Sequence, residues 1–222
     1  MSFFLNWSEE SYEYILTIPG YVALTILMLG AMLLILALKK DNKQKMSAKE
    51  IAFCAAAIAL ATVASFIKFS SLPYGGSITL FSMLFICFIG YVYGTRVGVM
   101  AGIAYGILQL ILGPYIYHPL QVILDYPLAF GALGLSGLFA KRPKGFLPGY
   151  IIGVAGRYIC HVISGYVFFA SYAPEGTNPM VYTLGYNATY IVPEMIATVV
   201  ILAVPAVSGA FLKVRNLAEE TA

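Results

Sequence analysis

Long apolar stretches separated by short polar breaks dominate the sequence. A helix that crosses a membrane needs about 20 consecutive, mostly apolar residues, and seven stretches come close to that length or exceed it. They cover residues 15–38, 51–67, 78–95, 97–113, 120–140, 146–171 and 179–212. The pattern predicts seven transmembrane helices. The last stretch is longer than one crossing requires, and we expect Pro193 and Pro205 to kink it within the membrane.

Positive charge falls at every second break between these stretches. The basic clusters are Lys39, Lys40, Lys43, Lys45 and Lys49, then Arg96, then Lys141, Arg142 and Lys144, then Lys213 and Arg215. The alternate segments, 1–14, 70–77, 114–119 and 172–178, contain no Lys or Arg. Because positive residues in short loops mark the cytoplasmic side, the sequence predicts a multi-pass protein of the cell membrane. Its N-terminus lies outside and its C-terminus in the cytoplasm.

Composition agrees with a protein that lies in membrane lipid. Hydrophobic residues make up 60% of the chain and charged residues 10%, and the mean hydropathy is +0.85. These values exclude a soluble domain, a disordered chain and a coiled coil. The net charge of +3 is small and dispersed, so we expect no nucleic-acid partner.

The sequence lacks the signatures of a metal centre or a common catalytic site. Cys54, Cys87 and Cys160 lie far apart in apolar stretches, which is typical of small core residues. No HExxH, GxSxG or Walker A motif is present. We therefore expect no metal and no cofactor.

Four ionisable residues lie inside the apolar stretches, where a charge is costly and usually faces a cavity or the bundle interior. They are Asp125, Arg157, His161 and Glu194. For Arg157 and Glu194, a buried ion pair that only holds helices together is an equally good interpretation.

Helical spacing gathers polar and aromatic side chains on three of the expected helices. His118, Gln121 and Asp125 recur at three or four residues and share a face. Similar faces on the next two helices start at their outer ends. We predict a ligand site formed by Asp125, Tyr126, Tyr158, His161, Phe169, Tyr182 and Asn187. A carboxylate beside aromatic rings suits a small cationic or aromatic heterocycle.

The second stretch carries small residues at helical spacing. Ala52 and Ala56 form one such pair, and Ala55/Ala59 and Ala57/Ala61 form two more. Small residues four apart allow another helix to approach closely. The neighbouring helix belongs either to this chain or to a partner protein.

Two segments of the chain carry a specific resemblance. HPLQVILDY at 118–126 and RYICHVISG at 157–165, supported by LPYGGS at 72–77 and YTLGYNATY at 182–190, closely resemble the thiamine-specific S component of energy-coupling factor (ECF) transporters. The similarity covers about residues 48–215. The resemblance implies an all-α integral membrane protein, a six-helix S-component bundle at 47–222. The segment 1–46, with the first apolar stretch and the basic loop, is an addition.

The resemblance also implies a function and a set of roles. The protein would capture thiamine from outside and dock onto an energising transmembrane subunit with two ATPase subunits, hydrolysing no ATP itself. Asp125, Tyr126, His161, Phe169, Tyr182 and Asn187 match the thiamine contacts of the family, and Tyr74 lies in the loop that covers the site. Ala52 and Ala56 match the family's small-residue contact with the energising subunit.

Other functions remain open on the sequence. The chain could be an S component for another vitamin, such as riboflavin, or for a thiamine precursor. An intramembrane enzyme acting on a lipid-linked substrate would need turnover that depends on His161 or Asp125. A purely structural subunit gives no reason for charge and aromatic rings at one end of three helices.

Overall fold

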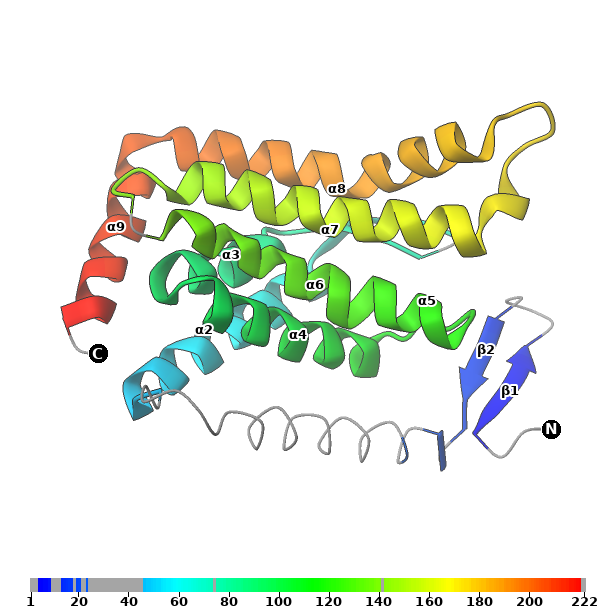
Figure 1. Ribbon diagram of the computed structural model, residues 1–222, viewed down its shortest axis with the longest axis horizontal. Coiled ribbons are helices and arrows are strands. Elements are labelled where there is room, and N and C mark those ends of the chain that lie inside the picture. The colour runs from blue at the N-terminus through cyan, green and yellow to red at the C-terminus, as the bar shows by residue number, and fades with distance from the viewer. Residues whose placement is uncertain are drawn as a thin grey trace.

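The computed structural model describes residues 4–8, 13–17, 19–20, 23, 46–73, 75–140 and 142–220, and these form a bundle of helices (Figure 1). Its helices are α2 (Ala48–Phe66), α3 (Ser82–Tyr93), α4 (Thr95–Leu112), α5 (Pro119–Ile123), the π-helical turn η1 (Leu124–Leu128), α6 (Ala129–Ala132), the 3-10 helix η2 (Leu133–Phe139), α7 (Phe146–Phe168), the short 3-10 helix η3 (Ala170–Tyr172), α8 (Pro179–Ala203) and α9 (Pro205–Glu220). The elements from α5 to η2 follow one another without a break and form one continuous helical segment, Pro119–Phe139. The predicted all-α membrane bundle is confirmed.

Five of these helices are long and apolar enough to cross a membrane, with α5 to η2 counted as one. The sixth, α3, has only 12 residues. It begins at Ser82 and not at 78 as expected, because residues 77–79 leave the helical path. They form strand β4 (Ser77–Thr79), which pairs antiparallel with β3 (Lys68–Ser71). The expected polar loop at 70–77 is thus largely a β-hairpin.

The N-terminal region also differs from the prediction where the structure describes it. Strands β1 (Leu5–Ser8) and β2 (Glu13–Leu16) pair antiparallel, with Leu5 opposite Leu16 and Asn6 opposite Ile15. The predicted start of the first helix at Ile15 is therefore wrong, because Ile15 and Leu16 complete this hairpin. Most of the remaining predicted stretch, through Leu38, lies outside the described residues.

The expected seventh helix, 179–212, is two helices. Helix α8 ends at Ala203, and Pro205 begins α9. Proline has no N–H to donate and a fixed φ, and both properties suit the first position of a helix. Pro205 therefore ends the crossing where a kink was expected, and α9 lies across one end of the bundle (Figure 1). The ring of Phe211 on α9 packs on Phe88 of α3, with centroids 4.9 Å apart.

Glycines let the central helices approach closely. A Cβ on Gly98 of α4 would lie 2.5 Å from the Cα of Gly90 on α3, and one on Gly134 of η2 would lie 2.1 Å from the backbone nitrogen of Val99. Any side chain at these positions would force the backbones apart. The helices are thus packed tightly at the centre of the bundle. The cavity inside the bundle lies at the ends of α4, α7 and α8 that are farthest from α9.

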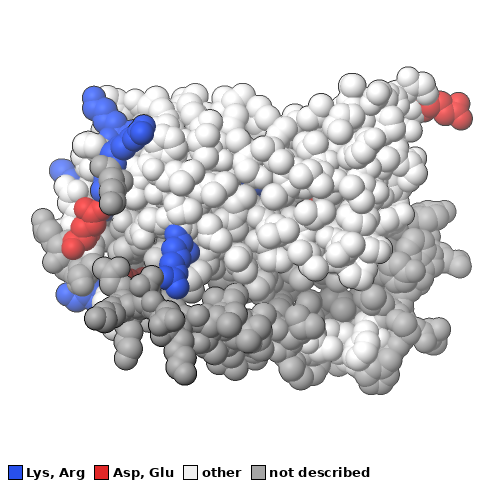
Figure 2. Space-filling view, in the orientation of Figure 1, with Lys and Arg blue, Asp and Glu red and all other residues white. Residues whose placement is uncertain are grey.

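Charge on the surface follows the ends of the bundle. In Figure 2, Lys and Arg gather at the end where α9 lies, acidic atoms occur at both ends, and a broad band between the ends is nearly free of charge. Large apolar side chains are exposed along the helices of this band, among them Leu60, Ile159, Val181 and Val200. An apolar outer surface of this kind is what a lipid-facing bundle requires.

Candidate functional site

A cavity of about 210 Å³ lies among η1, α4, α7, α8 and the β3–β4 hairpin. Six of the residues predicted for the ligand site line it together: Asp125, Tyr126, His161, Phe169, Tyr182 and Asn187. Tyr158 is not among the lining residues, and its hydroxyl donates to the backbone oxygen of Leu184 at 2.9 Å. Tyr74 lies outside the described residues.

The local break in the fifth crossing positions Asp125 and Tyr126. Pro127 has no N–H for the regular helical ladder, and it sits inside the π-helical turn η1. Such widened turns occur often at functional sites, and here two consecutive side chains both reach the cavity. Gly106 on α4 makes room for this turn, because a Cβ there would lie 2.4 Å from the backbone oxygen of Tyr126.

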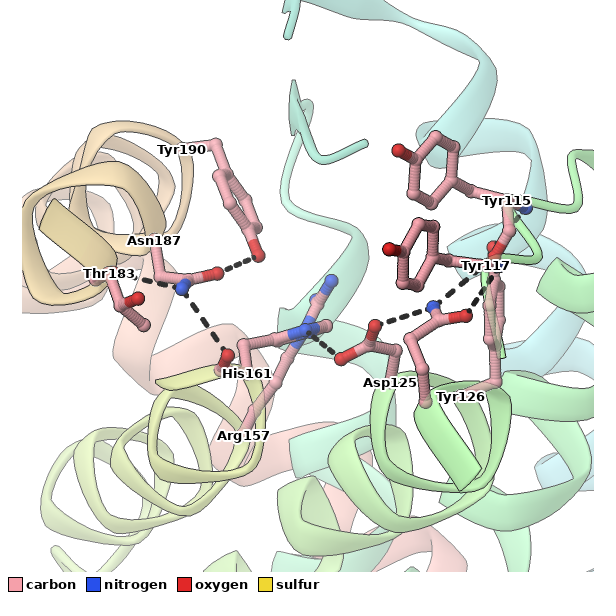
Figure 3. A network of polar contacts seen from close by, with 10 residues as sticks. Tyr115, Tyr117, Asp125, Tyr126, Arg157, His161, Thr183, Asn187 and Tyr190 are labelled. Carbon is pink, nitrogen blue, oxygen red and sulfur yellow. Dashed lines mark hydrogen bonds and ion pairs between the residues drawn. The ribbon is translucent and has the colours of Figure 1, made fainter. Parts of the chain in front are cut away.

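A chain of hydrogen bonds crosses the cavity wall (Figure 3). The Nε–H of Arg157 donates to Nε2 of His161 at 3.3 Å, and Nδ1 of His161 lies 3.0 Å from Oδ1 of Asp125. Because Nε2 accepts, the ring proton is on Nδ1 and points at the carboxylate, and the imidazole is neutral. His161 therefore orients Asp125 without cancelling its negative charge.

Gln121 holds the other oxygen of the carboxylate. This side chain is 1% exposed, and its Nε2 donates to Oδ2 of Asp125 at 2.6 Å. Its remaining groups bind the preceding loop, since Oε1 accepts from the N–H of Tyr117 at 3.0 Å and Nε2 also donates to the backbone oxygen of Tyr115 at 3.2 Å. The side-chain amide of Gln121 thus holds both the loop before α5 and the carboxylate of Asp125 in place.

Helices α7 and α8 form the opposite wall around Asn187. Its Nδ2 donates to the backbone oxygens of Thr183 at 3.0 Å and His161 at 3.3 Å, and its Oδ1 accepts from the hydroxyl of Tyr190 at 2.6 Å (Figure 3). Both amide N–H groups are used within the protein. Asn187 can therefore offer a ligand the second lone pair of Oδ1, which would accept from an amino group.

The β3–β4 hairpin closes one side of the cavity through its two turn glycines. The hydroxyl of Tyr186 donates to the backbone oxygen of Gly75 at 2.9 Å. Gly76 has φ +89°, and a Cβ there would lie 2.7 Å from the ring of Tyr190. Only glycine fits a positive φ and so close an approach without strain.

Aromatic rings surround the outer part of the cavity. The centroid of the Phe169 ring lies 5.2 Å from that of Tyr117 and 6.0 Å from that of Tyr115. Phe169 and Tyr115 line the cavity, and Tyr117 packs behind Phe169. Aromatic faces attract cations and stack on flat heterocycles. Among the described residues there is no group of three His, Cys, Asp or Glu side chains that could hold a metal ion.

The two deeper ionisable residues do not form the ion pair that was one interpretation of the sequence. The guanidinium of Arg157 lies over the Phe130 ring, 4.2 Å from its centroid. Glu194 accepts hydrogen bonds from Thr79, Ser82 and the N–H of Met83. In the described part of the chain, Arg215 and Glu219 form an ion pair, and the neutral His161 forms a hydrogen bond with Asp125.

Sequence reasoning left several lining residues out of the predicted site. Tyr186 and Tyr190 belong to the polar and aromatic stripe that helical spacing predicts on α8, but they were not included in the predicted site, and Thr183 was not identified. Tyr115 has no such signal, because it lies in the irregular segment before α5. Gly165 also lines the cavity, and its lack of a side chain lets α8 pack closely, because a Cβ there would lie 2.6 Å from Cγ2 of Thr183.

The fold and the cavity define a class: a multi-pass membrane protein with a polar, aromatic-lined cavity for a small ligand inside its helix bundle. The family model described as thiamine transporter protein matches residues 51–213. The chain therefore belongs to the thiamine transporter protein family. This membership confirms the resemblance to thiamine-specific S components and the expectation of a transport protein in place of an enzyme.

Individual relatives agree with the family. The chain is 39% identical to the thiamine transporter ThiT of Bacillus subtilis strain 168 over 176 residues, which cover 73% of this chain and 91% of the relative. It is 40% identical to the thiamine transporter ThiT of Lacticaseibacillus paracasei over 121 residues, 47% of this chain and 60% of the relative. The solved structure of ThiT from Listeria monocytogenes has the same fold. Its TM-score is 0.59 at 24% identity, over 73% of this chain and 96% of that one.

Proposed function

We propose that this protein binds thiamine in the cavity with high affinity and imports it as the substrate-binding subunit of an ATP-driven ECF transporter. The observation that carries the proposal is Asp125, a carboxylate whose two oxygens are hydrogen-bonded by Gln121 and His161 within a cavity lined by aromatic rings. The family and the relatives named as thiamine transporters support the choice of ligand.

The chemistry of the cavity suits the two rings of thiamine. Its thiazolium is a permanent cation that cannot lose its charge, so a buried site for it needs a fixed anion or aromatic faces. Asp125 and Phe169 supply these. Asn187 and Tyr182 read the pyrimidine edge, since Oδ1 of Asn187 accepts from the pyrimidine amino group.

Exposed alanines on α2 support docking onto an energising transmembrane subunit with two ATPase subunits. Ala52 and Ala56 are exposed, whereas Ala57 and Ala61 are buried against this protein's own core. The alanines therefore contact helices of both kinds. Ala57 and Ala61 pack against this chain, and the Ala52/Ala56 pair forms the interface with the partner protein. A close helix approach needs small residues on the outer face.

The proposal includes an orientation in the cell membrane. Basic residues gather at the α9 end (Figure 2), which we assign to the cytoplasm with the C-terminus. The cavity lies toward the other end and opens outside, where the N-terminus is placed. Residues 47–222 form the substrate-binding domain, and 1–46 form an additional segment.

Ligand choice is tested by calorimetric titration of the detergent-purified protein with thiamine, riboflavin and the free aminopyrimidine precursor. We expect tight binding of thiamine, at least a hundredfold weaker binding of the precursor, and none of riboflavin. Asn187→Ala should weaken thiamine binding by about tenfold, which corresponds to about 1.4 kcal/mol. Preference for riboflavin or the precursor would assign the site to another vitamin or to a precursor.

A further inference from the structure

Three ionised side chains lie in or directly behind the cavity wall. Asp125 and Arg157 line the cavity, and Glu194, which is 3% exposed, lies behind it on α8. His161 between them is neutral, because its Nε2 accepts from Arg157. Lys68 also lines the cavity but is exposed at the protein surface, so its charge is screened more than that of a buried group.

Both side-chain oxygens of Glu194 accept hydrogen bonds. Its Oε2 accepts from the hydroxyl of Thr79 at 2.6 Å, and its Oε1 accepts from the hydroxyl of Ser82 at 3.3 Å and the N–H of Met83 at 3.1 Å. Met83 lies in the first turn of α3, and the N-terminus of a helix stabilises negative charge. Thr79 and Ser82 both line the cavity, so the carboxylate is one side chain away from a bound ligand.

Arg157 brings the opposing charge. Its guanidinium stacks on Phe130 and donates through Nε to His161 (Figure 3), and it has no carboxylate within ion-pair distance among the described residues. Without Glu194, its positive charge would balance that of Asp125 and leave the region neutral. With Glu194, two negative charges face one positive charge.

We propose that Glu194 is a specificity-determining residue that gives the buried surroundings of the cavity a net charge of one negative unit, and so selects a monovalent cation. Charges inside a low-dielectric bundle act over longer distances than charges in water. Glu194 therefore favours the cationic ring without touching it. This inference rests on the proposed function, because thiamine carries one positive charge.

The test compares thiamine with its uncharged isostere, in which a thiophene replaces the thiazolium. Both are titrated calorimetrically into the wild-type protein, Glu194→Gln and Glu194→Asp. We expect Glu194→Gln to weaken thiamine binding at least fivefold and binding of the neutral isostere less than twofold. Glu194→Asp keeps the charge but shortens the side chain, so it should preserve the ratio of the two dissociation constants.

A second variant keeps the test decisive if Glu194→Gln folds poorly. Arg157→Gln removes the positive charge, and the ratio should shift at least fivefold in favour of thiamine. Equal losses for both ligands in Glu194→Gln, or an unchanged ratio in Arg157→Gln, would show that these residues only support the structure. Wild-type protein that binds neither ligand would instead refute the proposed function itself.

Discussion

Asp125 is useful to a cationic ligand because each of its oxygens already has a partner. His161 and Gln121 fix the carboxylate from two sides, so little reorganisation is needed when a ligand arrives. The sequence placed Asp125 and Gln121 on one helical face. It could not show that Gln121 bonds the carboxylate, because side-chain pairing depends on the π-helical turn that follows.

Gln121→Leu tests this positioning. The change leaves the N–H of Tyr117 without its partner and frees one oxygen of Asp125, at a cost of about 1–2 kcal/mol. We expect thiamine affinity, measured by calorimetry, to fall about tenfold. Gln109→Leu is the matched control, since Gln109 also lines the cavity but donates to Ser65. An equal loss in both variants would mean that Gln121 has no special role.

Among the elements, the β3–β4 hairpin was the part of the site that hydrophobic patterns could not predict. Its strands have only four and three residues, and its position depends on contacts with α8, more than 100 residues away in the sequence. The apolar crossings and their polar faces were predictable, because lipid imposes a minimum helix length. The division at Pro205 was missed because the apolar pattern continues past it.

Gly76→Ala tests the contact between the hairpin and α8. Alanine is strained at the positive φ of this position, and its Cβ would lie 2.7 Å from the Tyr190 ring. The substitution should therefore displace the hairpin and open that side of the cavity. We expect bound radiolabelled thiamine to exchange about ten times faster. Gly185→Ala is the control, because no atom lies within 4 Å of a Cβ there. An unchanged exchange rate in Gly76→Ala would show that the hairpin does not retain the ligand.

Gly134→Ala tests the closely packed centre of the bundle. The new methyl group would meet the backbone of Gly98 and Val99 at 2.1–2.2 Å, and overpacking of this kind costs about 1–3 kcal/mol. Thermal unfolding in detergent should shift down by several degrees, whereas Gly113→Ala, which has open space around it, should not shift. A Gly134→Ala protein as stable as the wild type would contradict the packing.

At the scale of the whole molecule, the cavity and the exposed alanines lie on different surfaces. Binding and transport should therefore separate. The double variant Ala52→Trp with Ala56→Trp should bind thiamine normally and lose uptake of labelled thiamine by cells, because the bulky rings block a close helix contact. Ala197→Trp, at an exposed alanine on α8, is the control. Normal uptake by the double variant would place the partner interface elsewhere.

The role of Asp125 in holding thiamine is tested directly by a thiamine titration of the purified wild-type protein and of Asp125→Asn. Asparagine keeps the size of the side chain but removes the charge that faces the cavity. We expect tight binding by the wild type and at least tenfold weaker binding by Asp125→Asn, about 1.4 kcal/mol, with no loss of thermal stability. Equal affinities for thiamine would contradict this role, because the fixed carboxylate would then not hold the cation.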